Sequence, residues 1–218
     1  MRPIPNDQLT NAARAIEAGE LVIVPTERWY MICADATNTA ACHSIFEGKQ
    51  RPRGKSLVLV TPSMDHCQQL FTLHPEAHCL AQTFWPGNLA LLLPWRNPDD
   101  TQHHSPVGSP ALVTHAPGTL GTLAARTRVP IAATTVNISG DAGIDAPGPA
   151  ITYDEVNAFL SLTGLKPAVT LDGGVSPAAN HLTIVDCSKP HAQLVRAGLV
   201  HERSLNAAIG RDLTTPAT

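Results

Sequence analysis

The residues best suited to chemistry form a basic cluster between positions 49 and 55. In Lys49-Gln50-Arg51-Pro52-Arg53-Gly54-Lys55, four of seven residues are cationic. Lys49 and Arg51 are two residues apart, so in an extended segment their side chains would point the same way. Such a pair can hold a triphosphate or a carboxylate, lysine as a point charge and arginine as a planar fork. A solvated basic loop is the commoner interpretation of this composition, but the tight connection between buried elements favours binding.

A second polar group follows the apolar run Ile131-Ala132-Ala133. Thr135, Asn137 and Ser139 place two hydroxyls and an amide at the end of a predicted strand. Ligands of open α/β sheets bind at strand ends, so this position suits a contact with phosphate or adenine. An ordinary turn has the same composition, and the segment alone does not decide between the two.

Two further segments bring polar residues to predicted strand ends. Residues 25–30 follow an apolar run and contain Thr26, Arg28 and Tyr30. Thr183 lies in the apolar run at 182–186, and Arg196 closes the run at 193–196. Arg196 could reach a nucleotide, and a surface cation is an equal alternative. A structural turn explains the first segment equally well.

Length and composition favour one α/β domain. The chain has 218 residues, of which 43% are hydrophobic and 15% charged, enough for a sizeable core. Periodicity and turn residues predict helices at 6–18, 39–47, 75–84, 118–128 and 153–162. They predict strands at 21–24, 56–60, 89–94, 111–114, 131–134, 169–171, 182–185 and 193–196.

The spacing of these elements predicts the type of sheet. Several strands follow one another too closely for helical crossovers, so we expect a mixed parallel and antiparallel sheet flanked by helices. Residues 1–200 are expected to form a single domain, and residues 201–218 a short C-terminal tail.

Several classes of protein are disfavoured by the sequence. The net charge of −3 argues against nonspecific nucleic-acid binding by bulk electrostatics. The five cysteines form no CxxC pair, and the adjacent His103 and His104 would diverge in regular structure, so we expect no dedicated metal site. Without a P-loop motif, ATP would have to bind in another way. Because no run approaches the roughly 20 apolar residues of a membrane span, we expect no membrane association and a cytoplasmic location.

Taken in chain order, these segments resemble the YrdC family over nearly the whole chain. Each motif is modest, but their common order is specific. The family patterns PTDTVYGL, KxRP, FWPGPLT, SAN-SG, STVVD and RxG correspond to residues 25–32, 49–52, 84–90, 135–140, 182–186 and 196–198.

The resemblance implies a YrdC-like open twisted sheet with a positively charged concave cleft. It implies that L-threonine, bicarbonate and ATP, the last with Mg²⁺, give threonylcarbamoyl-AMP and pyrophosphate for tRNA modification, with tRNA-modification proteins as partners. The matching residues fall into three groups. The implied catalytic cations are Lys49 and Arg51. The implied ATP contacts are these two and Thr135, Asn137, Ser139, Thr183 and Arg196. The implied acceptor contacts are Thr26, Arg28, Tyr30, Lys55 and His115.

Three departures fall on the acceptor side of the family pattern. Arg28 replaces a threonine, Met31 replaces a glycine, and His115 replaces an arginine. Arg28 could hold a carboxylate bidentately. The alternatives are therefore an enzyme that uses another amine or acid as acceptor in specialised metabolism, a non-catalytic protein that binds nucleotide or RNA, and a carbamoyl-transfer role.

Overall fold

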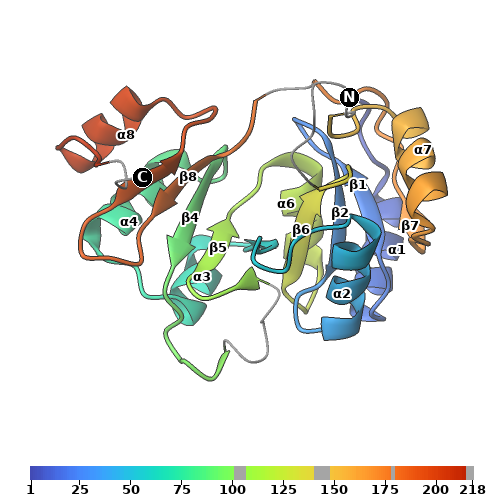
Figure 1. Ribbon diagram of the computed structural model, residues 1–218, viewed down its shortest axis with the longest axis horizontal. Coiled ribbons are helices and arrows are strands. Elements are labelled where there is room, and N and C mark those ends of the chain that lie inside the picture. Colours follow the sequence, from blue (N-terminus) through green and yellow to red (C-terminus); the bar gives the residue numbers. More distant parts are fainter. Residues whose placement is uncertain (101–106, 140–147, 178–179, 215–218) are drawn as a thin grey trace.

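The computed structural model describes residues 1–100, 107–139, 148–177 and 180–214. They form a nine-stranded sheet with strand order β7-β1-β2-β6-β3-β5-β4-β8-β9 (Figure 1). The strands are β1 (Val22–Pro25), β2 (Tyr30–Asp35), β3 (Val58–Val60), β4 (Leu89–Leu93), β5 (Ala111–Thr114), β6 (Ile131–Thr135), β7 (Val169–Thr170), β8 (Thr183–Asp186) and β9 (Gln193–Arg196). The helices are α1 (Asn6–Glu17), α2 (Thr39–Gly48), α3 (Met64–Leu70), α4 (Pro75–Phe84), α6 (Gly118–Arg126), α7 (Tyr153–Thr163) and α8 (Glu202–Ile209).

The sheet is mixed, as the spacing of the elements predicts. Strand β2 is antiparallel to both β1 and β6, whereas β3 runs parallel to β5 and β4 parallel to β8. Strand β2 is additional to the strands predicted from the sequence. It pairs with β1 as a hairpin in which Pro25 faces Tyr30, so the polar residues between them form the hairpin turn.

The two faces of the sheet are covered differently. The larger core cluster joins residues of α2, α4, α7 and α8 to strand residues such as Ile23 and Ile32. The second cluster joins α1 and α6 to the alternate residues Val22 and Met31. This division follows from the two-residue period of a strand. The second cluster draws on β1, β2, β3 and β6 but on none of the described residues of β4, β5 or β8. Helices α1 and α6 therefore leave one half of their face of the sheet open.

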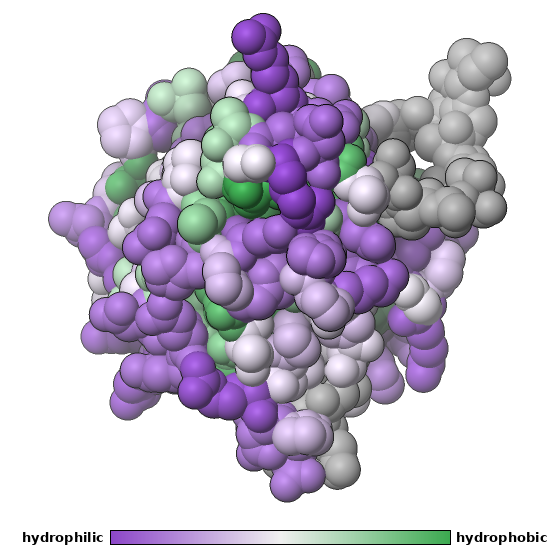
Figure 2. Space-filling model, turned by 90° about the vertical axis from the view of Figure 1, so that its left-hand side faces the viewer, coloured by the Kyte–Doolittle hydropathy of each residue, from purple (hydrophilic) through white to green (hydrophobic). Residues whose placement is uncertain are grey.

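The residues after position 200 pack against the end of the sheet rather than extending from it (Figure 1). Leu205 of α8 is fully buried, and Leu213 is buried behind it. Arg211 forms an ion pair with Glu76 of α4 at 2.6 Å. The side of the molecule at the left of Figure 1 is mainly hydrophilic, with small separate apolar areas (Figure 2). In the part of the chain that the structure describes, no helix is long and apolar enough to span a membrane.

Candidate functional site

The open half of the sheet forms the floor of a pocket of about 570 Å³. Its apolar floor consists of side chains from β3, β4, β5 and β8, namely Val58, Ala90, Leu92, Leu112 and Ile184. Arg28, Arg51, Lys55 and Arg196 also line the pocket, and the described lining residues include no aspartate or glutamate. The pocket therefore presents permanent positive charge above an apolar floor. This matches the concave, positively charged cleft that the sequence leads us to expect.

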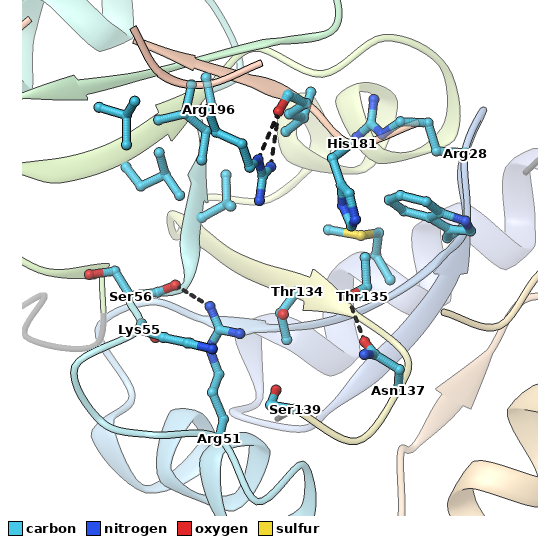
Figure 3. Close-up of a pocket in the computed structure, with 18 of the residues that line it drawn as sticks. Arg28, Arg51, Lys55, Ser56, Thr134, Thr135, Asn137, Ser139, His181 and Arg196 are labelled. Atoms are coloured by element: carbon cyan, nitrogen blue, oxygen red, sulfur yellow. Dashed lines mark hydrogen bonds between the residues drawn. The ribbon is translucent and has the colours of Figure 1, made fainter. Parts of the chain in front are cut away.

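Arg51 enters the pocket because the chain reverses after α2. Gln50 has a positive φ of 50°, so Lys49 and Arg51 do not lie on one extended segment and their side chains point differently. The Arg51 guanidinium donates to the main-chain oxygen of Lys55 at 2.8 Å and of Ser56 at 2.7 Å (Figure 3). Burial lowers the pKa of Arg51, but a guanidinium stays charged in proteins. Arg51 is thus a fixed cation with N–H groups left for a ligand.

Lys49 lies behind the pocket and is fully buried. Its Nζ donates to the main-chain oxygens of Thr135 and Asn137, and to Asn137 Oδ1 at 3.2 Å. Nζ also lies 5.8 Å from the centroid of the Phe159 ring. Burial, followed by the charge of Arg51, lowers the pKa of Lys49 to about 7. The three oxygens oppose this effect because a neutral amine has only two N–H bonds. Lys49 was predicted to contact phosphate, but here it supports the loop after β6.

That loop carries the second polar group predicted from the sequence. Thr135, Asn137 and Ser139 all line the pocket. The Thr135 hydroxyl donates to Asn137 Oδ1 at 2.7 Å (Figure 3), and the main-chain N–H of Ser139 donates to the main-chain oxygen of Lys49 at 2.7 Å. Residue 49 therefore holds this loop through both its side chain and its main chain. Gly140, the last residue of the motif, lies outside the described residues.

The turn between β1 and β2 brings Arg28 and Trp29 to the pocket. The Thr26 hydroxyl donates to the Trp29 oxygen at 2.7 Å and accepts from the N–H groups of Arg28 and Trp29, both at 3.3 Å. Thr26 is buried and is not among the lining residues. Its hydroxyl fixes the turn, so the direct contact with the acceptor predicted for Thr26 does not fit this geometry.

Arg196 and His181 complete the side of the pocket opposite Arg51 and Lys55 (Figure 3). The Arg196 guanidinium donates to the Leu182 oxygen at 3.0 and 3.2 Å. The His181 ring packs on Trp29 with centroids 4.7 Å apart. Burial, followed by the charges of Arg196 and Arg28, lowers the pKa of His181 and so favours its neutral ring.

Three other predicted site residues do not line the pocket. The Tyr30 hydroxyl donates to the Gly174 oxygen at 2.7 Å, on the other face of the hairpin. Thr183 is fully buried and its hydroxyl donates to the Val200 oxygen at 2.8 Å. His115 Nδ1 lies 2.9 Å from the Thr61 oxygen. Each of these side chains contacts a main-chain oxygen, and the direct ligand contacts expected of Tyr30, Thr183 and His115 stay predictions.

Sequence reasoning did not select several residues that line the pocket. Trp29 and His181 belong to different segments, and only the fold brings them together. Thr134 adds another hydroxyl beside the predicted Thr135. The period of β6 gave no reason to choose it. Within the described ranges, no group of three His, Cys, Asp or Glu side chains could hold a metal ion, and His103 and His104 lie outside those ranges.

The mixed sheet and cationic pocket define an α/β protein suited to anionic ligands. The chain belongs to the Sua5/YciO/YrdC family, because the sequence profile of that family, described as telomere recombination, matches residues 14–198. The Bacillus subtilis threonylcarbamoyl-AMP synthase is 31% identical over 206 residues, which are 93% of this chain and 57% of that protein.

Solved structures give the same fold. The structure of P. abyssi Sua5 complexed with L-threonine is 29% identical, with a TM-score of 0.80 over 96% of this chain and 59% of that one. E. coli YciO is 15% identical, with a TM-score of 0.78 over 94% of this chain and 97% of that one. The chain thus spans less than two thirds of the Bacillus and Pyrococcus proteins.

Proposed function

We propose that this protein makes a carbamoyl adenylate from ATP, bicarbonate and an amine such as L-threonine. The observation that carries the proposal is the pocket itself. Arg51, Lys55 and Arg196 line it together with the polar loop after β6, and no carboxylate is found among the lining residues that the structure describes. Membership of a family whose Bacillus relative is a threonylcarbamoyl-AMP synthase supports the same activity.

The proposed reaction has two steps. The amine and bicarbonate first give a carbamate and water. A carbamate oxygen then attacks the α-phosphorus of ATP, and the bond to the β-phosphate oxygen breaks to release pyrophosphate. Negative charge accumulates on the phosphates and on the carbamate, so fixed cations are the appropriate catalytic device. The rest of the rate acceleration comes from holding the attacking oxygen and the leaving group in line.

The side chains of the pocket suit these tasks. Arg51 is held by two main-chain oxygens, so it can meet the triphosphate without first being ordered. Asn137 and Ser139 offer hydrogen bonds to the nucleotide, and Arg196 a second cation at the rim. Lys49 acts on the nucleotide through the loop it supports. Mg²⁺ would be carried by the phosphates and would neutralise part of their charge.

The proposal extends to the use of the product. A threonylcarbamoyl adenylate is an activated acyl group, and its transfer to adenosine in tRNA would release AMP. Proteins that carry out this transfer would be the partners of the chain, and the cytoplasm would be the compartment. The similarity to the Bacillus threonylcarbamoyl-AMP synthase supports this extension, although the chain spans 57% of that protein.

Mass spectrometry of the product tests the proposal. The protein is incubated with ATP, Mg²⁺, ¹³C-bicarbonate and a panel of amino acids and simple amines. We expect an AMP conjugate that carries the ¹³C label and the mass of one acceptor. If ATP binds but no amine gives a conjugate, the enzymatic proposal is wrong and a nucleotide-binding role takes its place.

A further inference from the structure

Arg28 is a buried cation that forms no ion pair with an acid in the part of the chain that the structure describes. Arg28 is 6% exposed, and its Nη1 donates a hydrogen bond to Asn88 Oδ1. The ion pairs among the described residues involve Arg2, Arg128 and Arg211 but not Arg28. Burying a charge without a counter-ion is costly. Such an arrangement is expected where a ligand supplies the missing charge.

The nearest acid in sequence, Glu27, does not supply that charge. Its carboxylate lies against the first residue of α6, where a Cβ added to Gly118 would be 1.7 Å from Oε1. The partial positive charge of a helix N-terminus stabilises a carboxylate in that place. Glu27 still raises the pKa of Arg28 from a distance. Among the described residues, the Arg28 guanidinium therefore has no ion-pair partner, and Arg28 is one of the residues that line the pocket.

The position of Arg28 is fixed from two directions. Thr26 holds the hairpin turn through three hydrogen bonds, and Asn88 holds the guanidinium. His181 packs on the neighbouring Trp29, and His181 and Arg28 lie on the side of the pocket away from Arg51 (Figure 3). If the triphosphate occupies Arg51 and the loop after β6, Arg28 and His181 are left for the second reactant.

We propose that Arg28, assisted by His181, binds the carboxylate of the acceptor amine. The inference rests on the proposed function and narrows its substrate class to amines that carry a free carboxylate. A guanidinium presents two parallel N–H groups that match the two oxygens of a carboxylate. A neutral imidazole can donate one further hydrogen bond to the same group. Arg28 is in this sense a specificity-determining residue.

Equilibrium binding tests the proposal without requiring turnover. Amino acids (L-threonine, L-serine, L-alanine, L-aspartate and L-glutamate) and their α-carboxamides are titrated calorimetrically into the protein with a non-hydrolysable ATP analogue. We expect the tightest-binding amino acid to bind at least about tenfold better than its amide, because a charge-assisted hydrogen bond is lost. Equal binding of acid and amide, or no binding by any pair, would overturn the inference.

Variants assign the preference to Arg28. Arg28→Gln is expected to bring the ratio of the two affinities, amino acid over carboxamide, close to one, because only binding of the amino acid becomes weaker. Arg28→Lys is expected to retain part of the preference for the amino acid. Arg14→Gln, an exposed arginine on α1, is the control. An unchanged ratio in Arg28→Gln would show that the carboxylate binds elsewhere. Should Arg28→Gln fail to fold, the Arg28→Lys ratio decides, and an undiminished ratio there overturns the bidentate contact.

The carboxylate subsite and the proposed function can be contradicted independently of each other. A protein that prefers the acid but makes no AMP conjugate would contradict the proposed function and leave the carboxylate subsite standing. A protein that makes a conjugate equally well from an acid and its amide would contradict the carboxylate subsite and support the proposed function.

Discussion

Lys49 binds Asn137 through both the main-chain oxygen and the side-chain Oδ1 of that residue. The ammonium thereby joins the end of α2 to the loop that carries Thr135 and Ser139. A cation that the motif places among ligand contacts thus acts one layer deeper, on the residues that line the pocket. The pocket is therefore sensitive to changes behind it as well as to changes in its lining.

Lys49→Met is expected to destabilise the protein and to weaken nucleotide binding together. The substitution removes the donor from the main-chain oxygens of Thr135 and Asn137, whereas Asn137 Oδ1 keeps the Thr135 hydroxyl as a donor. The free energy of unfolding should therefore fall by about 2–4 kcal/mol. Urea unfolding and a nucleotide titration measure the two effects. Arg51→Met, at the half-buried pocket wall, is expected to weaken binding with little loss of stability. An unchanged urea midpoint for Lys49→Met would contradict the supporting role.

Thr26→Val removes the hydroxyl that fixes the β1–β2 turn while keeping the shape of the side chain. The turn loses one donated and two accepted hydrogen bonds, so stability should decrease by about 1–2 kcal/mol. Thr26→Ser retains the hydroxyl and should remain close to wild type. Thermal unfolding compares the two variants, and equal melting temperatures would rule out a role for the hydroxyl.

Gly118→Ala is expected to disturb the start of α6. Gly118 has a φ of +60°, and an added Cβ would be 1.7 Å from Glu27 Oε1. The left-handed backbone alone costs a non-glycine residue about 1–2 kcal/mol, and Glu27 must also move. Gly148→Ala, where an added Cβ meets nothing within 4 Å, is the matched control. Chemical denaturation measures the free energy of unfolding of both variants. Equal values would show that the backbone at Gly118 relaxes without cost and would contradict the prediction.

Glu76 makes the stability of the protein sensitive to acid. Two bonds from Arg211, at 2.6 and 2.7 Å, and one from the Ala192 N–H lower the pKa of Glu76 to about 2 from a usual value of 4.5. A carboxyl group with a lowered folded-state pKa stabilises the protein above the unfolded pKa. That stability is lost as the pH falls from about 4.5 towards 2.

Glu76→Gln is therefore expected to lose about 2 kcal/mol of stability at pH 7, a value reduced from the full shift because water reaches part of the side chain. The variant should also lose part of the stability difference between pH 5 and pH 2.5 that the wild type displays. Unfolding curves at these pH values measure it, with the exposed Glu47→Gln as control. Parallel pH profiles for wild type and Glu76→Gln would refute the assignment.

Most of the fold could be predicted from the sequence, because the patterns that indicate helices and strands are local. Short apolar runs predicted eight of the strands, two of them with both ends correct and six with ends that differ by one or two residues. The strand at Tyr30–Asp35 is as fully buried as β1, but it directly follows the polar segment 25–30, so the pattern predicted the end of one strand and not the turn of a hairpin. Its absence from the prediction also concealed the hairpin turn that presents Arg28.

The site could be predicted only in part, for a different physical reason. Arg51, Asn137 and Ser139 line the pocket as their motifs indicate. Lys49 does not, because the positive φ of Gln50 reverses the chain between the two cations. A single non-glycine residue with positive φ leaves no clear pattern in a sequence. His181 reaches the pocket from a segment 152 residues after Trp29, and only the tertiary fold creates their contact.

Pyrophosphate release tests the central claim most directly. We predict that the wild-type protein releases pyrophosphate from ATP only when bicarbonate and a carboxylate-bearing amine are both present. Arg51→Ala should lower kcat/KM at least about 100-fold, because a fixed cation at the phosphates is lost. Arg53→Ala removes an exposed arginine that does not line the pocket, and it should stay within about threefold of wild type. Release without an acceptor, or equal rates for the two variants, would contradict the account.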